Sequence, residues 1–200
     1  DAVIWRGPMV SQLIQQFIKN VAWGALDVLV VDLPPGTGDS QLTLTQTIPL
    51  TGAVIVSTPQ AIALADAVKG ANMFREVKVP VMGLIENMSY FECPHCAHRT
   101  NIFSTEGAKQ KSLEIDVEYL GALPLEESTR TAGDEGVPIV VREPLGHQAG
   151  VFIKMADSLW AKLEKRAGVD RSAFFKNNSK GNNLKTSKTT QGSDEGGFEV

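Results

Sequence analysis

Two short stretches of this sequence carry residues that can do chemistry. The first is the run of eight residues from Asp32 to Asp39, which follows an apolar segment and contains two prolines and two glycines. A carboxylate such as Asp32, at the carboxyl end of a parallel strand, lies at the sheet edge where α/β folds bind ligands. Gly36 and Gly38 lack side chains, so backbone N–H groups there can approach a phosphate closely. The run predicts a loop for phosphate and Mg²⁺; a buried strand with an ordinary Gly/Pro turn is the alternative.

The second stretch contains both cysteines of the chain, Cys93 and Cys96, separated by Pro94 and His95. This spacing suggests metal or redox chemistry rather than a secreted disulfide framework. A thioredoxin-like dithiol is one hypothesis, but it needs the first cysteine at a helix N-terminus after a strand, whereas the flanking residues here are irregular. Zinc is a second, with His95 or His98 added to an incomplete ligand set. An iron–sulfur cluster is the third, with four thiolates supplied by two copies of the chain.

Alternating strands and helices must position both stretches. The continuously apolar run at residues 27–33 predicts a strand that is buried on both faces of a parallel sheet. Three more runs of this kind predict strands at residues 52–58, 80–85 and 117–123. Apolar residues at helical spacing predict helices at about residues 10–21, 62–77, 105–113 and 148–166, and the polar residues 40–47 predict a helix or switch segment. The alternation predicts an α/β fold, a doubly wound and mostly parallel sheet with helices on both faces.

Composition excludes several classes of protein. The chain has 200 residues, of which 42% are hydrophobic and 21% charged, enough for one α/β domain with a real core. Its formal net charge of -4 argues against a nucleic-acid-binding protein, which would need a basic face. Since no apolar run approaches the length of a membrane span, we expect no stable membrane insertion.

Further motifs extend beyond these two stretches, and together they show that the chain resembles the Mrp/ApbC family of iron–sulfur cluster carrier ATPases. This family belongs to the MinD/Mrp group of P-loop ATPases, and the chain is most similar to its mitochondrial, nucleotide-binding-protein-like branch. The matching blocks are residues 5–9, 32–39, 52–60, 69–70, 73–74, 79–81, 86–89 and 93–96. Ala61 is a departure, because the family usually has an acidic residue after Gln60, so no role is carried over to that side chain.

The phosphate-binding loop of the family has no counterpart in this sequence. That loop needs the motif Gly-x-x-x-x-Gly-Lys-Ser/Thr, and no Gly-Lys pair occurs in the 200 residues. In the family, the motif lies on the first strand and helix of the domain. The resemblance therefore implies that residues 1–168 correspond to the C-terminal part of a MinD/Mrp-like P-loop ATPase domain.

The resemblance also implies roles for individual residues. Asp32 matches the Walker B aspartate, which positions Mg²⁺ or water, and Gly36 matches the switch II glycine whose N–H meets the γ-phosphate. Asp39 could orient water or report the nucleotide state, and it could equally cap the next helix. Asn87 matches a position that hydrogen-bonds adenine, although an Asn that ends a strand in a turn is the alternative. Pro124 matches a segment whose backbone lines the base.

The function that the resemblance implies is ATP-dependent delivery of a [4Fe–4S] cluster to apo-proteins, with respiratory complex I assembly as one destination. It favours a cluster bridging Cys93 and Cys96 of two subunits in a homodimer, ATP and Mg²⁺ as cofactors, and the mitochondrial matrix (alternatively the cytoplasm) as compartment. A MinD-like membrane-partitioning ATPase is one alternative, but it needs a basic amphipathic C-terminal helix, and residues 149–166 carry mixed charges. A nucleotide-independent zinc scaffold is another, because the phosphate loop is absent.

Deleting residues 172–200 should leave the melting temperature essentially unchanged. This segment is polar and rich in Gly, Ser, Thr and Asn, so it buries too little surface to offset the entropy of ordering it, and we predict a disordered tail. Calorimetry of the chain that ends at residue 171 checks the prediction. Strong amide-exchange protection within residues 177–192 would contradict it.

Overall fold

The central element of the fold is a parallel sheet. The computed structural model describes residues 7–33, 36 and 38–167 of the chain. The strands β1 (Ala53–Ser57), β2 (Val81–Glu86) and β5 (Tyr119–Ala122) pair in the order β1-β2-β5. Both pairings are parallel, with Ser57 opposite Glu86 and Glu86 opposite Ala122. The carboxyl ends of the three strands therefore meet at one edge of the sheet.

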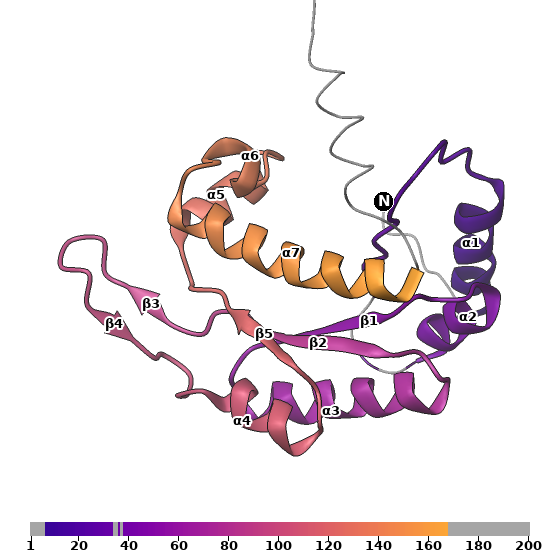
Figure 1. Cartoon of the computed structure of the whole chain (residues 1–200), viewed down its shortest axis with the longest axis horizontal. Coiled ribbons are helices and arrows are strands. Elements are labelled where there is room, and N and C mark those ends of the chain that lie inside the picture. The colour runs from indigo at the N-terminus through magenta and orange to yellow at the C-terminus, as the bar shows by residue number, and fades with distance from the viewer. Residues whose placement is uncertain (1–6, 34–35, 37, 168–200) are drawn as a thin grey trace, which may run out of the picture.

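Helices cover both faces of this sheet. Figure 1 shows α3 (Ala61–Glu76) and α4 (Gly107–Glu114) on one face and α7 (His147–Ala167) on the other. The strands at residues 52–58, 80–85 and 117–123 and the helices expected from about residues 62, 105 and 148 are confirmed within a few residues. Among the described residues, no helix is both long enough and apolar enough to cross a membrane.

Buried apolar side chains join the sheet to α3 and α4. On α3, Leu64, Ala71 and Phe74 lie seven and three residues apart, which places them on one helix face, and they are buried against the sheet. Leu84 lies in the middle of β2 and is completely buried in the same cluster. Fully burying a side chain of this size stabilises the folded chain by about 1.5–3 kcal/mol, so this layer is the main apolar core of the described structure.

Two short helices and a hairpin were not predicted. The helices α5 (Glu127–Asp134) and α6 (Ile139–Arg142) lie between β5 and α7, where polar residues hide the helical spacing of the few apolar ones. The hairpin consists of β3 (Phe91–Glu92) and β4 (Arg99–Thr100), which pair antiparallel. Figure 1 shows it projecting away from the sheet, beyond α4.

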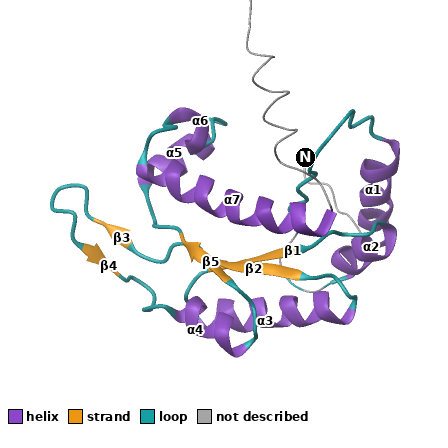
Figure 2. Cartoon of the chain, in the orientation of Figure 1, coloured by secondary structure: helices purple, strands orange, loops and turns teal. Residues whose placement is uncertain are grey.

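The apolar run at residues 27–33 differs from the sequence prediction. It lies in the connection between α1 (Gly7–Asn20) and α2 (Asp39–Thr47), has no strand conformation, and is drawn as a loop in Figure 2. A strand is stable only when its N–H and C=O groups pair with a neighbour, and the described parallel sheet contains only β1, β2 and β5. Val30 is 86% exposed. The prediction of a buried strand that ends at Asp32 is therefore wrong.

The helices on both sides of that connection are confirmed. α1 and α2 pack against each other at one end of the molecule. Leu44 of α2 is almost completely buried. After α1, the indole N–H of Trp23 donates a hydrogen bond to the carbonyl oxygen of Phe17 at 3.0 Å, which folds the start of the connection back onto the helix.

Replacing Gly107 by alanine should destabilise the fold, because α4 begins in close contact with the loop after β1. A Cβ atom at Gly107 would lie 2.8 Å from the carbonyl oxygen of Pro59. A backbone atom cannot move aside as a flexible side chain can, so we expect the free energy of unfolding to fall by about 1–3 kcal/mol. Urea denaturation measures the change.

Gly150→Ala is the matched control for this prediction. Gly150 lies in α7, and a Cβ there would meet no atom within 4 Å. Because alanine loses less backbone entropy than glycine in a helix, this variant should gain about 0.5–1 kcal/mol. A Gly107→Ala variant as stable as the Gly150→Ala variant would contradict the close packing of α4.

Candidate functional site

The carboxyl ends of the parallel strands form the base of the candidate site. Asn87 follows β2 directly, and its N–H donates to the carbonyl oxygen of Ser57 at the end of β1, at 2.8 Å. The Asn87 side-chain oxygen Oδ1 accepts the N–H of Met88 at 2.9 Å, and Met88 has a φ of 55°. The chain therefore turns sharply at the position that the sequence analysis assigns to adenine binding. Asn87 lies at the predicted sheet edge, and its role in binding a base stays a prediction.

Hydrogen bonds join the residues after β2 to those after β5. The N–H of Leu123 donates to the carbonyl oxygen of Glu86 at 2.8 Å, and the N–H of Ser89 donates to that of Leu123 at 2.9 Å. One residue further, the N–H of Leu125 donates to the carbonyl oxygen of Tyr90 at 2.8 Å. Pro124 lies within this ladder and is buried. The structure thus brings together Asn87 and Pro124, the two residues predicted to line a base, on adjacent hydrogen-bonded segments.

Glu86, the last residue of β2, is a buried carboxylate that the sequence analysis missed as an individual site residue. It is only 1% exposed. Oε1 accepts the hydroxyl of Ser89, and Oε2 accepts the N–H of Ala108 in the first turn of α4 at 2.7 Å. A buried carboxylate is tolerated when N–H and O–H groups satisfy it, and the positive end of a helix favours it further. Burial, and then the charge of Glu86, raise the pKa of Tyr119 above its ordinary value. The sequence signals for Glu86 are its place in the matching block 86–89 and a charged residue at the end of an apolar strand.

The predicted phosphate loop lies only in part within the described residues, since residues 34, 35 and 37 fall outside them. Gly36 has a φ of 93°, a conformation that other residues rarely adopt. Its carbonyl oxygen accepts the side-chain Nε2 of Gln41 at 2.9 Å, and Gln41 is buried in α2. Asp32 is exposed, and Asp39 is the first residue of α2, with a side chain outside the described part of the structure. The roles of Asp32, Gly36 and Asp39 toward Mg²⁺, water and phosphate therefore stay predictions.

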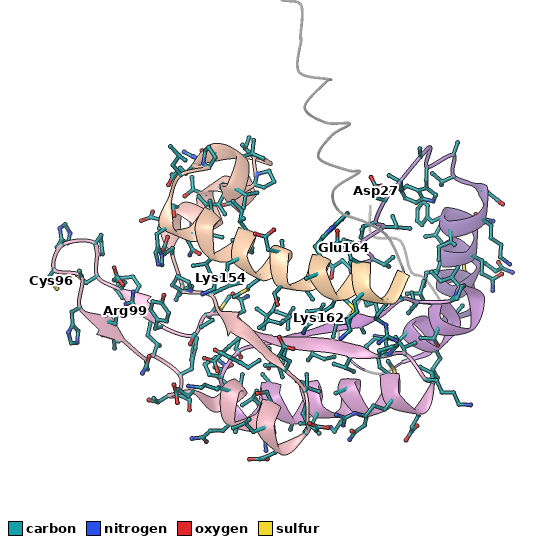
Figure 3. The ribbon with its side chains drawn as sticks, in the orientation of Figure 1. Asp27, Cys96, Arg99, Lys154, Lys162 and Glu164 are labelled. Atoms are coloured by element: carbon teal, nitrogen blue, oxygen red, sulfur yellow. The ribbon has the colours of Figure 1, made fainter. Side chains whose placement is uncertain are left out.

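The cysteine stretch forms the turn of the hairpin between β3 and β4. The N–H of Cys93 donates to the carbonyl oxygen of His98 at 3.0 Å, and the N–H of Ala97 donates to that of Cys93 at 2.8 Å. Ala97 has a φ of 54°, which closes the turn. Cys93 is half-buried, Cys96 is exposed, and both are free thiols. Figure 3 shows Cys96 at the far end of the hairpin from the sheet. Cys93 lies in a turn rather than at a helix N-terminus, so the geometry that a thioredoxin-like dithiol needs is absent.

The turn also polarises the first thiol. Hydrogen bonds from the backbone N–H groups of His95 and Cys96, and then from the Cys96 side chain, lower the pKa of the Cys93 thiol. A thiolate rather than a thiol is the metal ligand. Among the described residues, no group of three or more His, Cys, Asp and Glu side chains is arranged to hold a metal ion. The described residues therefore offer two thiols in one turn.

Arg99 braces the base of the hairpin. Its Nε donates to Oε2 of Glu92 on the paired strand at 2.6 Å, and its guanidinium carbon lies 4.7 Å from the centre of the Tyr90 ring. Both contacts lie at the surface, where water screens the charges, so each contributes little to the stability of the fold. Since the carbonyl of Tyr90 is bonded to Leu125, the brace connects the cysteine turn to the segment after β5.

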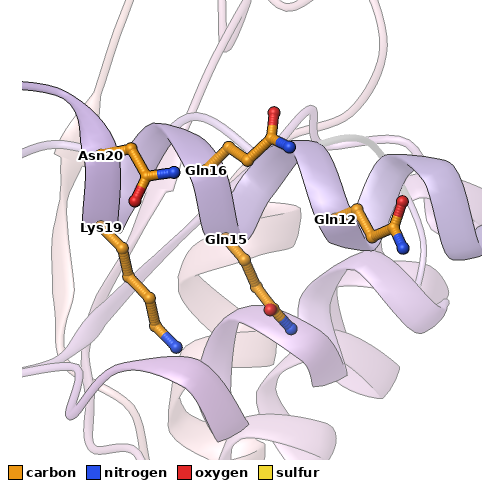
Figure 4. Close-up of a pocket in the computed structure, with 5 residues that line it drawn as sticks. All are labelled: Gln12, Gln15, Gln16, Lys19 and Asn20. Carbon is orange, nitrogen blue, oxygen red and sulfur yellow. The ribbon is translucent and has the colours of Figure 1, made fainter.

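Two surface hollows lie apart from the predicted site residues. One, of about 340 Å³, is lined by Gln12, Gln15, Gln16, Lys19 and Asn20. Figure 4 shows that these side chains all come from α1, so they form the outer polar face of one helix. The other, of about 390 Å³, is apolar and lies among α5, α6 and α7. Neither hollow is lined by a cysteine, by Asn87 or by Pro124.

Comparison with known protein sequences gives matches that cover most of the chain. The sequence model of a ParA-type family described as NUBPL iron-transfer P-loop NTPase matches residues 1–160. The iron-sulfur cluster transfer protein NUBPL of Dictyostelium discoideum is 51% identical over 164 residues, which are 82% of this chain and 51% of that protein. The iron-sulfur protein required for NADH dehydrogenase, mitochondrial, of Arabidopsis thaliana is 53% identical over 142 residues, 71% of this chain and 45% of that protein. The chain spans about half the length of the curated relatives it matches.

Solved structures share the fold. A nucleotide-binding protein from Archaeoglobus fulgidus in complex with ADP is 39% identical, with a TM-score of 0.60 over 68% of this chain and 55% of that chain. The cell division ATPase MinD of Pyrococcus furiosus is 19% identical, with a TM-score of 0.57 over 80% of this chain and 63% of that chain. The second likeness concerns the fold alone. Together with the helices on both faces of a parallel sheet, these structures confirm the predicted doubly wound, MinD-like fold class.

Alkylation by iodoacetamide should reveal the lowered pKa of Cys93. Backbone N–H groups stabilise its thiolate, so Cys93 should ionise, and therefore react, at a lower pH than a cysteine in an unfolded chain. Mass spectrometry of Cys93 alkylation over a series of pH values measures the pH at which the alkylation rate reaches half of its maximum. The same chain in concentrated urea is the matched control, because unfolding removes the N–H contacts. Equal midpoints in the folded and unfolded chains would contradict the prediction.

Proposed function

The chain belongs to the NUBPL iron-transfer P-loop NTPase family, and from this premise we propose that it is the cargo-binding part of an ATP-dependent iron–sulfur cluster carrier. The observation that carries the proposal is the cysteine hairpin. It presents Cys93 and Cys96 as free thiols in one turn, with Cys96 at the end of the hairpin far from the sheet and the pKa of the Cys93 thiol lowered.

The proposed cargo is a [4Fe–4S] cluster that bridges two copies of the chain. Such a cluster needs four thiolates, and each copy contributes the pair Cys93 and Cys96. A two-fold axis through the cluster would bring the two hairpins together with the same surface of each copy in contact. The exposed position of the hairpin supports this arrangement, because both a second copy and the thiols of a recipient protein can reach it.

The proposed cofactors are ATP and Mg²⁺. Asp32 and Asp39 would act on Mg²⁺ and on the attacking water, and Gly36 would donate its N–H to the γ-phosphate. Asn87 and Pro124 would bind the adenine at the strand ends. Their place on one hydrogen-bonded ladder supports a common role in base binding. ATP binding would close the dimer through the segment around Gly36, and hydrolysis would relax it.

We propose the mitochondrial matrix as the compartment and apo iron–sulfur proteins as the recipients, with subunits of respiratory NADH dehydrogenase among them. The Arabidopsis relative, whose name connects it with NADH dehydrogenase and mitochondria, supports this destination. The soft thiolate pair supports the chemical class of the cargo. A nucleotide-independent zinc scaffold is the competing function, because His95 and His98 lie within two residues of Cys96 in the sequence.

Anaerobic reconstitution with iron and sulfide tests the proposal. Because two chains supply the four thiolates, we expect about four iron atoms per two chains. The fraction of chains in the dimer should rise together with the thiolate-to-iron charge-transfer absorbance, since cluster binding and dimer formation strengthen each other. Metal analysis, light scattering and absorption spectroscopy measure the three quantities. Cys93→Ser and Cys96→Ser should each abolish cluster binding and dimer formation together.

A variant with both His95→Ala and His98→Ala is the matched control. It leaves both thiols in place, so the cluster and the dimer should form as in the unmodified chain. A zinc site that uses a histidine nitrogen would instead be lost. One tightly bound zinc per chain with no iron, removed by the histidine changes, would refute the carrier proposal and support the zinc scaffold.

A further inference from the structure

We propose that Glu86 is a positioning residue for the cluster site: its buried carboxylate ties the root of the cysteine hairpin to α4 and thereby fixes where Cys93 and Cys96 are held. The inference rests on the proposed cluster-binding function, because it concerns the geometry of that site. It rests otherwise on hydrogen bonds within the described residues.

The Glu86 carboxylate has two separate partners on two separate elements. Oε1 accepts the hydroxyl of Ser89, three residues later in the chain, and Oε2 accepts the N–H of Ala108, which is 22 residues away. All three groups are buried. An apolar side chain in place of Glu86 would leave a hydroxyl and an N–H without their partner in a dry environment, which is the costly way to lose a hydrogen bond.

A series of contacts leads from Ser89 to the cysteines. The N–H of Ser89 is bonded to Leu123, and the next residue, Tyr90, is bonded to Leu125. The Tyr90 ring makes a cation–π contact with the guanidinium of Arg99. Arg99 also pairs with Glu92, which precedes Cys93 in the chain. The Glu86–Ser89 bond thus stands at the start of a continuous chain of contacts that ends at the first ligand.

The helix α4 gives the Glu86 carboxylate a fixed support. Gly107 lies so close to the loop after β1 that an added Cβ would be 2.8 Å from the Pro59 carbonyl oxygen. The start of α4 is therefore packed tightly against the loop after β1, and the N–H of Ala108 holds Oε2 of Glu86 in place. Asn87, in the turn proposed to bind the base, follows Glu86 directly in the chain.

Three variants separate a positioning role from a purely structural one. Glu86→Met removes both hydrogen bonds at similar side-chain length. Ser89→Ala removes only the bond toward the hairpin and leaves the Ala108 bond intact. Glu86→Gln keeps an acceptor for Ala108 and can donate to the Ser89 oxygen, so it is the conservative variant that should restore function. Glu114→Met is the matched control, because Glu114 lies on α4 but is exposed.

The first readout is amide exchange in the cluster-free protein at the amides of Ser89, Leu125 and Ala108. Loss of a buried hydrogen bond should speed local exchange by about tenfold. Glu86→Met should affect all three amides, and Ser89→Ala should affect those of Ser89 and Leu125 alone. Glu86→Gln and Glu114→Met should resemble the unmodified chain. If Glu86→Met does not fold, Ser89→Ala still tests the link to the hairpin.

The second readout is the reconstituted cluster. Ser89→Ala should change the visible circular dichroism of the cluster and speed the loss of iron to a chelator by about tenfold, with the melting temperature little changed. Unchanged exchange at Leu125 and an unchanged cluster signal in Ser89→Ala would overturn the proposal and leave Glu86 as a cap of α4. The exchange readout needs no cluster, so a failure of the carrier function and a failure of this inference give different results.

Discussion

The backbone hydrogen bonds of the central strand β2 are the constraint on which the rest of the described structure depends. β2 pairs with β1 on one side and β5 on the other, and parallel strands are stable only when both their backbone and their two faces are covered. Leu84, fully buried in its middle, anchors α3 and α4. Its last residue, Glu86, and the two that follow form the turn from which the candidate site is built. The strand β2 therefore supports both the apolar core and the turn of the candidate site.

The hairpin shows how a weakly packed element is given a defined direction. β3 and β4 have two residues each, and such a short ribbon is not stable alone. Its exposed brace of Arg99, Glu92 and Tyr90 contributes little, because water screens charges at a surface. The stronger support is at its root, where Ser89 and Tyr90 are bonded to the segment after β5. The turn can therefore be exposed to partners while its origin is fixed.

The helix α7, which covers the face of the sheet away from α3 and α4, fixes the segment after β5. Gly121 in β5 has a φ of 147°, and an added Cβ would lie 2.7 Å from the end of the Met155 side chain, so α7 packs directly on the strand. Lys162 of α7 also reaches the carbonyl oxygen of Met82 and the carboxylate of Glu118. At the start of α7, the Gln148 amide donates to the carbonyl oxygen of Pro124 at 3.4 Å. The long helix thus holds the strand end to which the hairpin root is bonded.

The sequence by itself determined the elements whose pattern is local. The inward residues of α3 and the apolar runs of β1, β2 and β5 follow from side-chain spacing. The closeness of the two free thiols, Cys93 and Cys96, follows from the two residues that separate them. The same rule failed at residues 27–33, because apolar character makes a strand only where a neighbouring strand accepts its hydrogen bonds. The contact between Glu86 and Ala108 was decided by the tertiary structure alone. A carboxylate that ends a strand has no sequence signal for the helix N-terminus 22 residues away; only the folding of α4 against the sheet brings that N–H within reach.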